Sequence, residues 1–274
     1  MRKFKEVILK VLLYLSALIT VGILVFIIGF IFIKGYKLIN FNYLFGEYKP
    51  SGGGGIKPFI VSTLYTIELS LIVATPIGVL SAVYLHEYAK QGRLVKIIRY
   101  STEALSGIPS IVYGLFGAAF FVTTLKFGYS LIAGSLTLSI IILPVIIRTT
   151  EEALKVVPPS YREASLGLGA TRFQTLYKVI LPSAVPGIVS GVVLSMGRVI
   201  GESAALFLTA GTVYKMPTSI MSSARTLTVH AFLETKEKGD IASAAAAGIV
   251  LIVMIFILNL LAKFVSKKFN KANY

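Results

Sequence analysis

The sequence predicts an all-α membrane protein with six transmembrane helices. Hydrophobic residues make up 55% of its 274 residues and charged residues only 14%, whereas soluble domains contain about 25% charged residues. No polar stretch is long enough for a separate soluble domain of about 100 residues. Six segments have the roughly 20 mostly apolar residues that a membrane-spanning helix needs. These segments are 11–33, 59–85, 104–125, 130–147, 184–209 and 243–262.

The first apolar segment follows a basic N-terminus, as in a signal peptide. However, it is longer than the roughly 7–15 apolar residues of a signal peptide, and no small-residue cleavage site follows it. We therefore expect a retained span and, at 51–55, a flexible loop of one Ser and four Gly residues. On this basis the chain divides into an N-terminal span with its outer loop (1–58), a main membrane domain (59–265) and a basic tail (266–274).

The distribution of Lys and Arg predicts the orientation. The side with both termini and the 149–183 loop carries 17 of these residues, the other side carries 9, and Arg198 lies inside the fifth span. Basic loops stay in the cytoplasm, so we expect both termini to be cytoplasmic in a multi-pass inner-membrane protein. The basic residues flank apolar segments and form no stripe with interleaved aromatic residues, which argues against nucleic acid as a partner.

The residues needed for most enzymatic chemistry are missing. The chain has no Cys, and its two His residues, His86 and His230, are far apart. A disulfide or a thiolate metal site is thus excluded, and no metal site or cofactor is expected. No His or paired-carboxylate constellation could run a reaction. We therefore expect a membrane protein that is not an enzyme.

The loop 149–183 is more organised than a simple connection requires. Pro158 and Pro159 end the preceding helix, and Ser160-x-x-Glu163 predicts a capping box that starts a new one. Gly169 is a favourable helix stop, and Thr171-x-x-Gln174 predicts a second capping box. Local chemistry alone allows Glu163 to be only a cap and Gly169 only a stop. The alternative is that the loop is shaped to be held by a partner. A short helix is also expected in the long loop 211–242.

The spacing within this loop resembles the EAA motif of ABC importer permeases. The matching residues are Glu163-Ala164-Ser165, Gly169, Val179 and Leu181-Pro182, with Ser165 and Val179 as mild departures from the motif. The resemblance implies a type I, MetI-like architecture. It also implies that this segment is a coupling helix in a groove of a cytoplasmic ATPase, with Glu163, Ala164, Ser165 and Gly169 at the contact.

Other segments resemble the permeases of phosphate importers, and the Gly-Glu-Ser-Ala-Ala run at 201–205 resembles their PstA type. The remaining matches lie at 63–65, 76–78, 87–89 and 107–114. This resemblance implies phosphate translocation by alternating access. It implies three kinds of protein partner: a PstC-like second permease, a dimer of PstB-like ATPases and a PstS-like phosphate-binding protein. ATP and Mg²⁺ would bind to the ATPase and not to this chain.

Three ionisable residues lie inside predicted spans: Glu68, Arg198 and Glu202. Each costs about 2.5–3.5 kcal/mol at the centre of a membrane helix, so such residues pair or line a water-filled path. Arg198 and Glu202 are four residues apart, and two interpretations stay open: an internal ion pair, or an anion path on which Glu202 tempers Arg198. Glu68 is expected at a similar depth, facing the same path and able to pair with Arg198.

Two questions stay open at this point. Small residues recur every four residues in the fifth span, at Gly187, Gly191 and Ser195 and again at Gly197 and Gly201, and either set could pack on the chain's own helices or on a partner. The substrate could also be another oxyanion, such as sulfate or molybdate. From another class, an ion-coupled secondary carrier is the alternative, although no internal repeat is evident.

Overall fold

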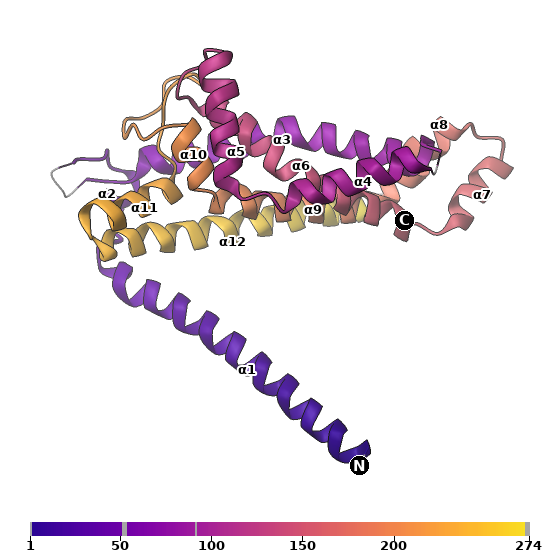
Figure 1. Cartoon of the computed structure of the whole chain (residues 1–274), viewed down its shortest axis with the longest axis horizontal. Coiled ribbons are helices and arrows are strands. Elements are labelled where there is room, and N and C mark those ends of the chain that lie inside the picture. Colours follow the sequence, from indigo (N-terminus) through magenta and orange to yellow (C-terminus); the bar gives the residue numbers. More distant parts are fainter. Residues whose placement is uncertain (1, 51–53, 91, 272–274) are drawn as a thin grey trace.

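The structure, a computed structural model, describes residues 2–50, 54–90 and 92–271, and within them it contains helices and no strand. Figure 1 shows the arrangement. The helices are α1 (Arg2–Gly35), α2 (Phe41–Phe45), α3 (Lys57–Val83), α4 (Arg93–Ser106), α5 (Ser110–Gly117), α6 (Leu131–Val156), α7 (Pro159–Gly167), α8 (Arg172–Thr175), α9 (Leu181–Gly201), α10 (Ala204–Thr209), α11 (Leu227–Lys238) and α12 (Ile241–Lys271). Three π-helical segments extend or connect them: η2 (Tyr84–Tyr88), η3 (Ala118–Thr124) and η4 (Leu176–Ile180).

Five of the six predicted spans are confirmed as helices that are long and apolar enough to cross a membrane. They are Lys5–Leu38, Lys57–Tyr88, Leu131–Val156, Arg172–Gly201 and Ile241–Phe264. The basic tail expected at 266–274 continues α12 as far as Lys271, and its last three residues lie outside the described part. Part of the Gly-rich loop, 51–53, lies outside it as well.

The third span differs from the prediction. A single helix over 104–125 is wrong, because the chain bends by 98° between α4 and α5. Proline has no N–H to donate and disfavours a helical conformation in the residue before it. Pro109 accordingly adopts φ −58° and ψ 138° and starts a new helix at Ser110. The fifth span also ends earlier than the expected residue 209, since α9 ends at Gly201 and α10 is a separate helix.

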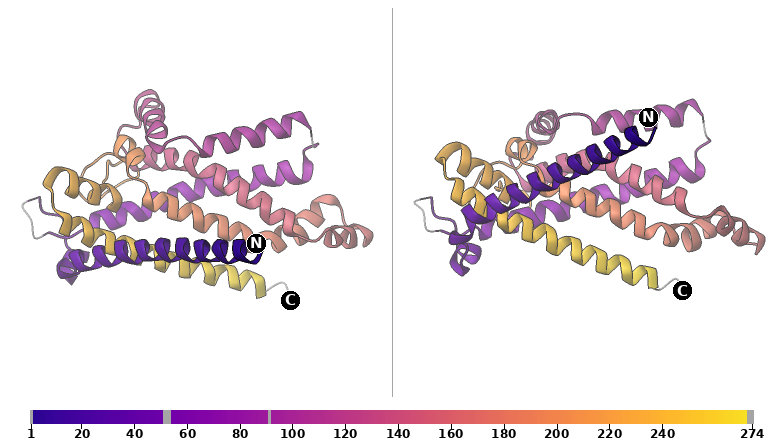
Figure 2. Two further views of the ribbon diagram at one scale, coloured as in Figure 1. Left: turned by 60° about the horizontal axis from the view of Figure 1, so that its bottom comes forward. Right: turned by 90° about the horizontal axis from the view of Figure 1, so that it is seen from below.

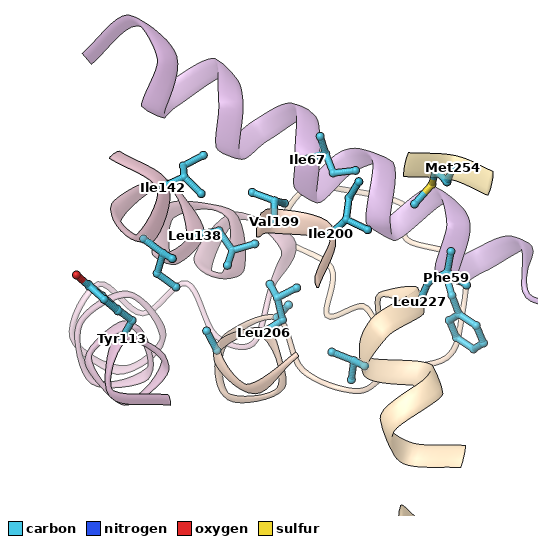
Figure 3. Packing of buried hydrophobic residues seen from close by; sticks show 14 of the residues in the cluster. Phe59, Ile67, Tyr113, Leu138, Ile142, Val199, Ile200, Leu206, Leu227 and Met254 are labelled. Atoms are coloured by element: carbon cyan, nitrogen blue, oxygen red, sulfur yellow. The ribbon is translucent and has the colours of Figure 1, made fainter. Parts of the chain in front are cut away.

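The hydrophobic core lies between α3, α6 and α9. Figure 3 shows Ile67 of α3 beside Val199 and Ile200 of α9, and Leu138 of α6 belongs to the same buried cluster. Helix α6 is the most enclosed of the spans: 67% of its most apolar 18-residue stretch is buried inside the chain. Helix α6 is therefore the centre of the core, and each of the other spans has a face that no part of this chain covers.

The two sets of small residues in α9 face different surroundings. A Cβ atom on Gly191 would lie 2.0 Å from Thr149 Oγ1, and one on Gly187 would lie 2.4 Å from Ala153 Cβ, both on α6. A Cβ atom on Gly197 or Gly201 would meet nothing within 4 Å. The first set therefore allows close packing within the chain, whereas the second set lies on an open surface.

Helix α1 leaves the bundle at an angle (Figures 1 and 2). Its last turn packs on α12, where a Cβ atom on Gly35 would lie 2.5 Å from the Ala246 nitrogen. Most of its apolar side chains are exposed. The first residues of α1 and the last residues of α12 point toward the end of the bundle that carries α7 and α8, which we call the α7 end. Helices α2 and α11 lie at the opposite end, the α11 end (Figures 1 and 2).

Candidate functional site

Two breaks between consecutive helices meet at one place in the bundle: the bend between α4 and α5, and the end of α9 before α10. Helix α5, after the first break, packs directly on α10, after the second. A Cβ atom on Gly114 of α5 would lie 2.8 Å from the Ala205 Cα of α10. Only glycine allows this approach of the two backbones. The junction of the breaks at 107–109 and 202–203 is therefore a tightly packed and well-defined part of the fold.

Arg198 lies at this junction, half-buried in the last turn of α9. Its charge acts on the phenol of Tyr113 in α5, and the Tyr113 hydroxyl in turn donates to the Leu105 carbonyl of α4 at 2.8 Å. Within the described residues the guanidinium forms no ion pair with a carboxylate. A positive charge thus stands beside the break between α4 and α5.

The predicted contact between Arg198 and Glu202 is wrong in this structure. It required both residues on one helix, but α9 ends at Gly201 and Glu202 is extended, with φ −80° and ψ 127°. The Glu202 carboxylate accepts instead from the Ala205 N–H, at 3.2 Å. It therefore satisfies a backbone donor at the start of α10, where a negative charge is favourable.

Glu68 lies at the expected depth but points elsewhere. Its neighbour Ile67 is buried in the same cluster as Val199, next to Arg198 in sequence (Figure 3). Glu68 itself is exposed on the outer face of α3, among the exposed side chains Leu64 and Ile72. The described residues show no ion pair between Glu68 and Arg198, so the predicted pairing does not form within this chain.

The loop 149–183 folds into two short helices, as predicted. Gly169 ends α7 with a left-handed φ of +84°, which favours glycine. The Thr171 side chain and Gln174 form the predicted reciprocal capping box at α8. The other predicted box, from Ser160 to Glu163, is wrong: α7 begins one residue earlier, at Pro159, without a side-chain cap. Proline is favoured at the first helical position, because no N–H is needed there.

The predicted coupling residues differ in accessibility. Glu163, Ala164 and Gly169 are exposed, whereas Ser165 is half-buried and its hydroxyl lies 2.9 Å from the Thr175 hydroxyl of α8. Helix α7 buries none of its residues. Next to it, the exposed rings of Phe173 (68% exposed) and Tyr177 (67%) stack into an apolar patch, and Leu168 at the end of α7 is 90% exposed. Exposed apolar patches of this kind mark interaction sites.

Sequence analysis missed the polar contacts that join distant segments. At the α7 end, Arg162 of α7 pairs with Glu87 of η2 at 2.5 Å, and Arg99 of α4 pairs with Glu151 of α6 at 3.0 Å. Glu87 and Arg162 are 75 residues apart. No local pattern could have paired them.

At the α11 end, a buried Glu234 carboxylate accepts from the Tyr48 hydroxyl and from Lys238 Nζ, both at 3.0 Å. Its Oε1 also lies 3.6 Å from the Nδ1 of buried His230. Burial, followed by the positive charges of Arg225 and Lys238, lowers the pKa of His230 from 6.5 to about 3. His230 is therefore neutral at physiological pH, and this network closes the α11 end.

The architecture and the motif agree with a family match. Residues 74–271 match the model of the family described as binding-protein-dependent transport system inner membrane component. The chain belongs to this family. Among curated proteins, the chain is similar to the probable ABC transporter permease protein YqgI of Bacillus subtilis, which is 36% identical over 266 residues, covering 91% of this chain and 90% of that protein.

Phosphate transport system permeases are also similar to this chain. PstA 1 of Mycobacterium tuberculosis is 34% identical over 76% of this chain and 69% of its own length. PstA of Pasteurella multocida is 37% identical over 76% and 75%. Both matches omit part of the present chain.

Solved structures place the permease in the MetI-like fold, as the resemblance implied. A bacterial ABC transporter involved in import of the acidic polysaccharide alginate superposes with a TM-score of 0.66, at 19% identity, over 98% of this chain and 99% of that one. The MetNI methionine ABC transporter superposes with a TM-score of 0.58, at 20% identity, over 78% and 94%. In the described part of this permease no cluster of three or more His, Asp or Glu could hold a metal ion.

Proposed function

We propose that this chain is a transmembrane permease subunit of an ATP-driven importer of inorganic phosphate. The observation that carries the proposal is Arg198, a guanidinium without a carboxylate partner among the described residues, placed where the bend between α4 and α5 meets the break between α9 and α10. Arg presents a planar fork of donors that matches phosphate oxygens. The names of the PstA relatives support phosphate as the anion.

Arg198 would attract the anion, and the junction would open and close around it. An unpaired Arg in a membrane span raises the free energy of the protein. Binding of an anion to Arg198 offsets part of this cost, which favours binding of the substrate at this site. Glu202 has a positioning role in this proposal: its carboxylate caps the start of α10 and so fixes the second break beside Arg198. Because it makes no ion pair with Arg198, it leaves the guanidinium available to the substrate.

Glu68 is proposed to face a second, PstC-like permease. It is an ionisable residue on an exposed, apolar face of a membrane span, and such residues face a partner or a water-filled path instead of lipid. The substrate path would then lie between the two permeases, with Glu68 on its wall. The Glu68→Gln variant should lower phosphate uptake or assembly of the complex. Unchanged uptake together with unchanged assembly would remove Glu68 from the path.

The remaining partners follow from the α7 end, which we propose to be cytoplasmic together with both termini. A separate, PstB-like ATPase dimer would hydrolyse ATP with Mg²⁺ and hold α7 at its exposed residues Glu163, Ala164 and Gly169. Ser165 would instead hold α7 against α8, because its hydroxyl lies next to the Thr175 hydroxyl of α8. A PstS-like binding protein would deliver phosphate at the α11 end. This chain itself would carry no cofactor and perform no chemistry.

The deciding experiment is uptake of labelled phosphate by the assembled transporter. Arg198→Ala should lower uptake by about 10–100-fold, the value of one or two charge-assisted hydrogen bonds. Arg93→Ala, which removes an exposed Arg at the start of α4, should leave uptake unchanged. Wild-type uptake by Arg198→Ala would overturn the role of Arg198. Faster uptake of sulfate or molybdate than of phosphate would overturn the substrate and keep the oxyanion class.

A further inference from the structure

Helix α7 is attached to the membrane bundle on two sides. On one side it continues into α8 and η4, which it contacts directly. On the other side Arg162 reaches across to Glu87 at 2.5 Å. The Glu87 side chain is 15% exposed and that of Arg162 is 38% exposed, so water shields this pair less than it shields a surface ion pair.

A cavity separates α7 from the bundle around this contact. It has a volume of about 400 Å³ and lies between η2, α7 and α8, with Tyr88, Leu166 and Arg172 among its lining residues. Apolar packing therefore does not join α7 to η2 here, and α7 buries none of its own residues. The ion pair is the connection through which a displacement of α7 would pull on η2.

The segment η2 is also joined to two other spans. The Leu85 carbonyl of η2 accepts from Arg99 Nη2 of α4 at 3.5 Å. The same guanidinium holds the largely buried Glu151 carboxylate of α6, at 3.1 Å from Nε. Single π turns inside α-helices are frequent at functional sites. The π-helical segment η2, at the end of α3, contacts α7, α4 and α6.

Helix α4 leads from this contact to the break beside Arg198. It runs from Arg93 to Ser106 and ends at the 98° bend into α5. Its last carbonyls include that of Leu105, which accepts the Tyr113 hydroxyl. A shift of α4 along or about its axis would thus act on the junction at which Tyr113 and Arg198 lie.

We propose that η2 is a relay: Glu87, held by Arg162, transfers the movement of α7 to α3 and, through Arg99, to α4 and the break. The inference rests on the proposed function, since it needs an ATPase that displaces α7. Glu87, Arg162 and Arg99 are positioning residues, because none of them touches the proposed anion site. The alternative is a static contact that only helps the loop to fold.

Measuring ATP hydrolysis and phosphate uptake on the same proteoliposomes separates these two possibilities. Glu87→Gln and Arg162→Gln should each lower the phosphate taken up per ATP by about fivefold, as expected for a partly shielded ion pair, with assembly unchanged. The charge-exchanged double variant, Glu87→Arg with Arg162→Glu, should recover most of the ratio. Glu152→Gln is the matched control, because it removes an exposed pair with Lys155 at 3.1 Å beside the same loop.

A distance measurement tests the relay without using phosphate. The chain has no Cys, so spin labels can be placed at Ile97→Cys on α4 and Ile257→Cys on α12, both exposed, to report the separation of these two helices. The separation of α4 and α12 should change when ATP binds to the assembled complex, and Glu87→Gln should abolish the change. A wild-type ratio in both single variants, no recovery in the exchanged variant, or an unaltered distance change in Glu87→Gln would overturn the relay. Absence of phosphate uptake by the wild type would instead overturn the proposed function, and the distances would still decide the relay.

Discussion

The two ends of the bundle are stabilised in opposite ways. At the α11 end, Glu234 and His230 are almost fully buried and hold Tyr48 and Lys238 in one network. At the α7 end, α7 buries no residue, and Leu168 and Phe173 are exposed. The difference supports the proposal that another protein covers the α7 end, whereas the α11 end already has a buried polar network within this chain. Four changes would test this contrast, from the largest expected effect on stability to the smallest.

Removal of the carboxylate at the centre of the α11 end should have the largest effect. Glu234→Ala removes the acceptor of the Tyr48 hydroxyl and of Lys238 Nζ and should lower the free energy of unfolding by about 3 kcal/mol. The Lys238 side chain is partly exposed, so water can hydrate its ammonium group in the variant. The loss of unfolding free energy is therefore smaller than for a fully buried ion pair. Thermal unfolding in detergent measures it. Glu237→Ala, an exposed change on the same helix, should be neutral; equal losses for both variants would contradict the role of the network.

The next effect concerns the middle of the bundle, between the two ends. Gly191→Ala places a methyl group against Thr149, with 2.0 Å to its Oγ1, and should cost about 1–3 kcal/mol by overpacking. Gly197→Ala meets nothing within 4 Å and should not lower stability. The same unfolding measurement compares the two. A neutral Gly191→Ala would mean that α9 and α6 are not closely packed there.

The α11 end should also respond to pH through His230. Its pKa is about 3 in the folded chain and 6.5 when free, so below pH 6.5 the unfolded state binds a proton that the folded state does not. The contribution of His230 to the free energy of unfolding is therefore fully present above pH 6.5. It is lost as the pH falls below that value, by up to about 1.4 kcal/mol per pH unit. Unfolding between pH 7.5 and 5.5 should show this slope, and His230→Gln should reduce it. An equal slope in both proteins would assign the pH dependence to other groups.

The α7 end should lose function before it loses stability. Leu168→Asp changes a side chain that is 90% exposed, so the unfolding free energy of this chain should stay within about 0.5 kcal/mol of the wild type. Binding of the ATPase should weaken by about tenfold or more, because a charge would enter an apolar contact. Co-purification and titration with the ATPase measure the change. Full binding by Leu168→Asp would place the contact elsewhere on the chain.

Local sequence chemistry predicted a large part of the fold. Five of six spans follow from apolar length alone, and the Thr171–Gln174 cap and the Gly169 stop follow from patterns within a few residues. The short helix α11 is expected from the length of its loop. The predicted third span contains Pro109, and its bend of 98° at that point was not predicted. Pro76, Pro144 and Pro186 lie inside continuous helices. A proline weakens a helix locally, and the neighbouring helices decide whether it breaks.

The order of residues along the chain was sufficient to predict a helical membrane protein with an organised loop and a charged residue, Arg198, inside a span. These features depend on residues close together in the chain, for which spacing is sufficient. Only the tertiary structure decided that Glu202 caps α10 instead of pairing with Arg198, that Glu68 faces outward, and that Arg162 meets Glu87. Such contacts depend on where each helix ends and on which face meets its neighbour, and the packing of the whole bundle sets both.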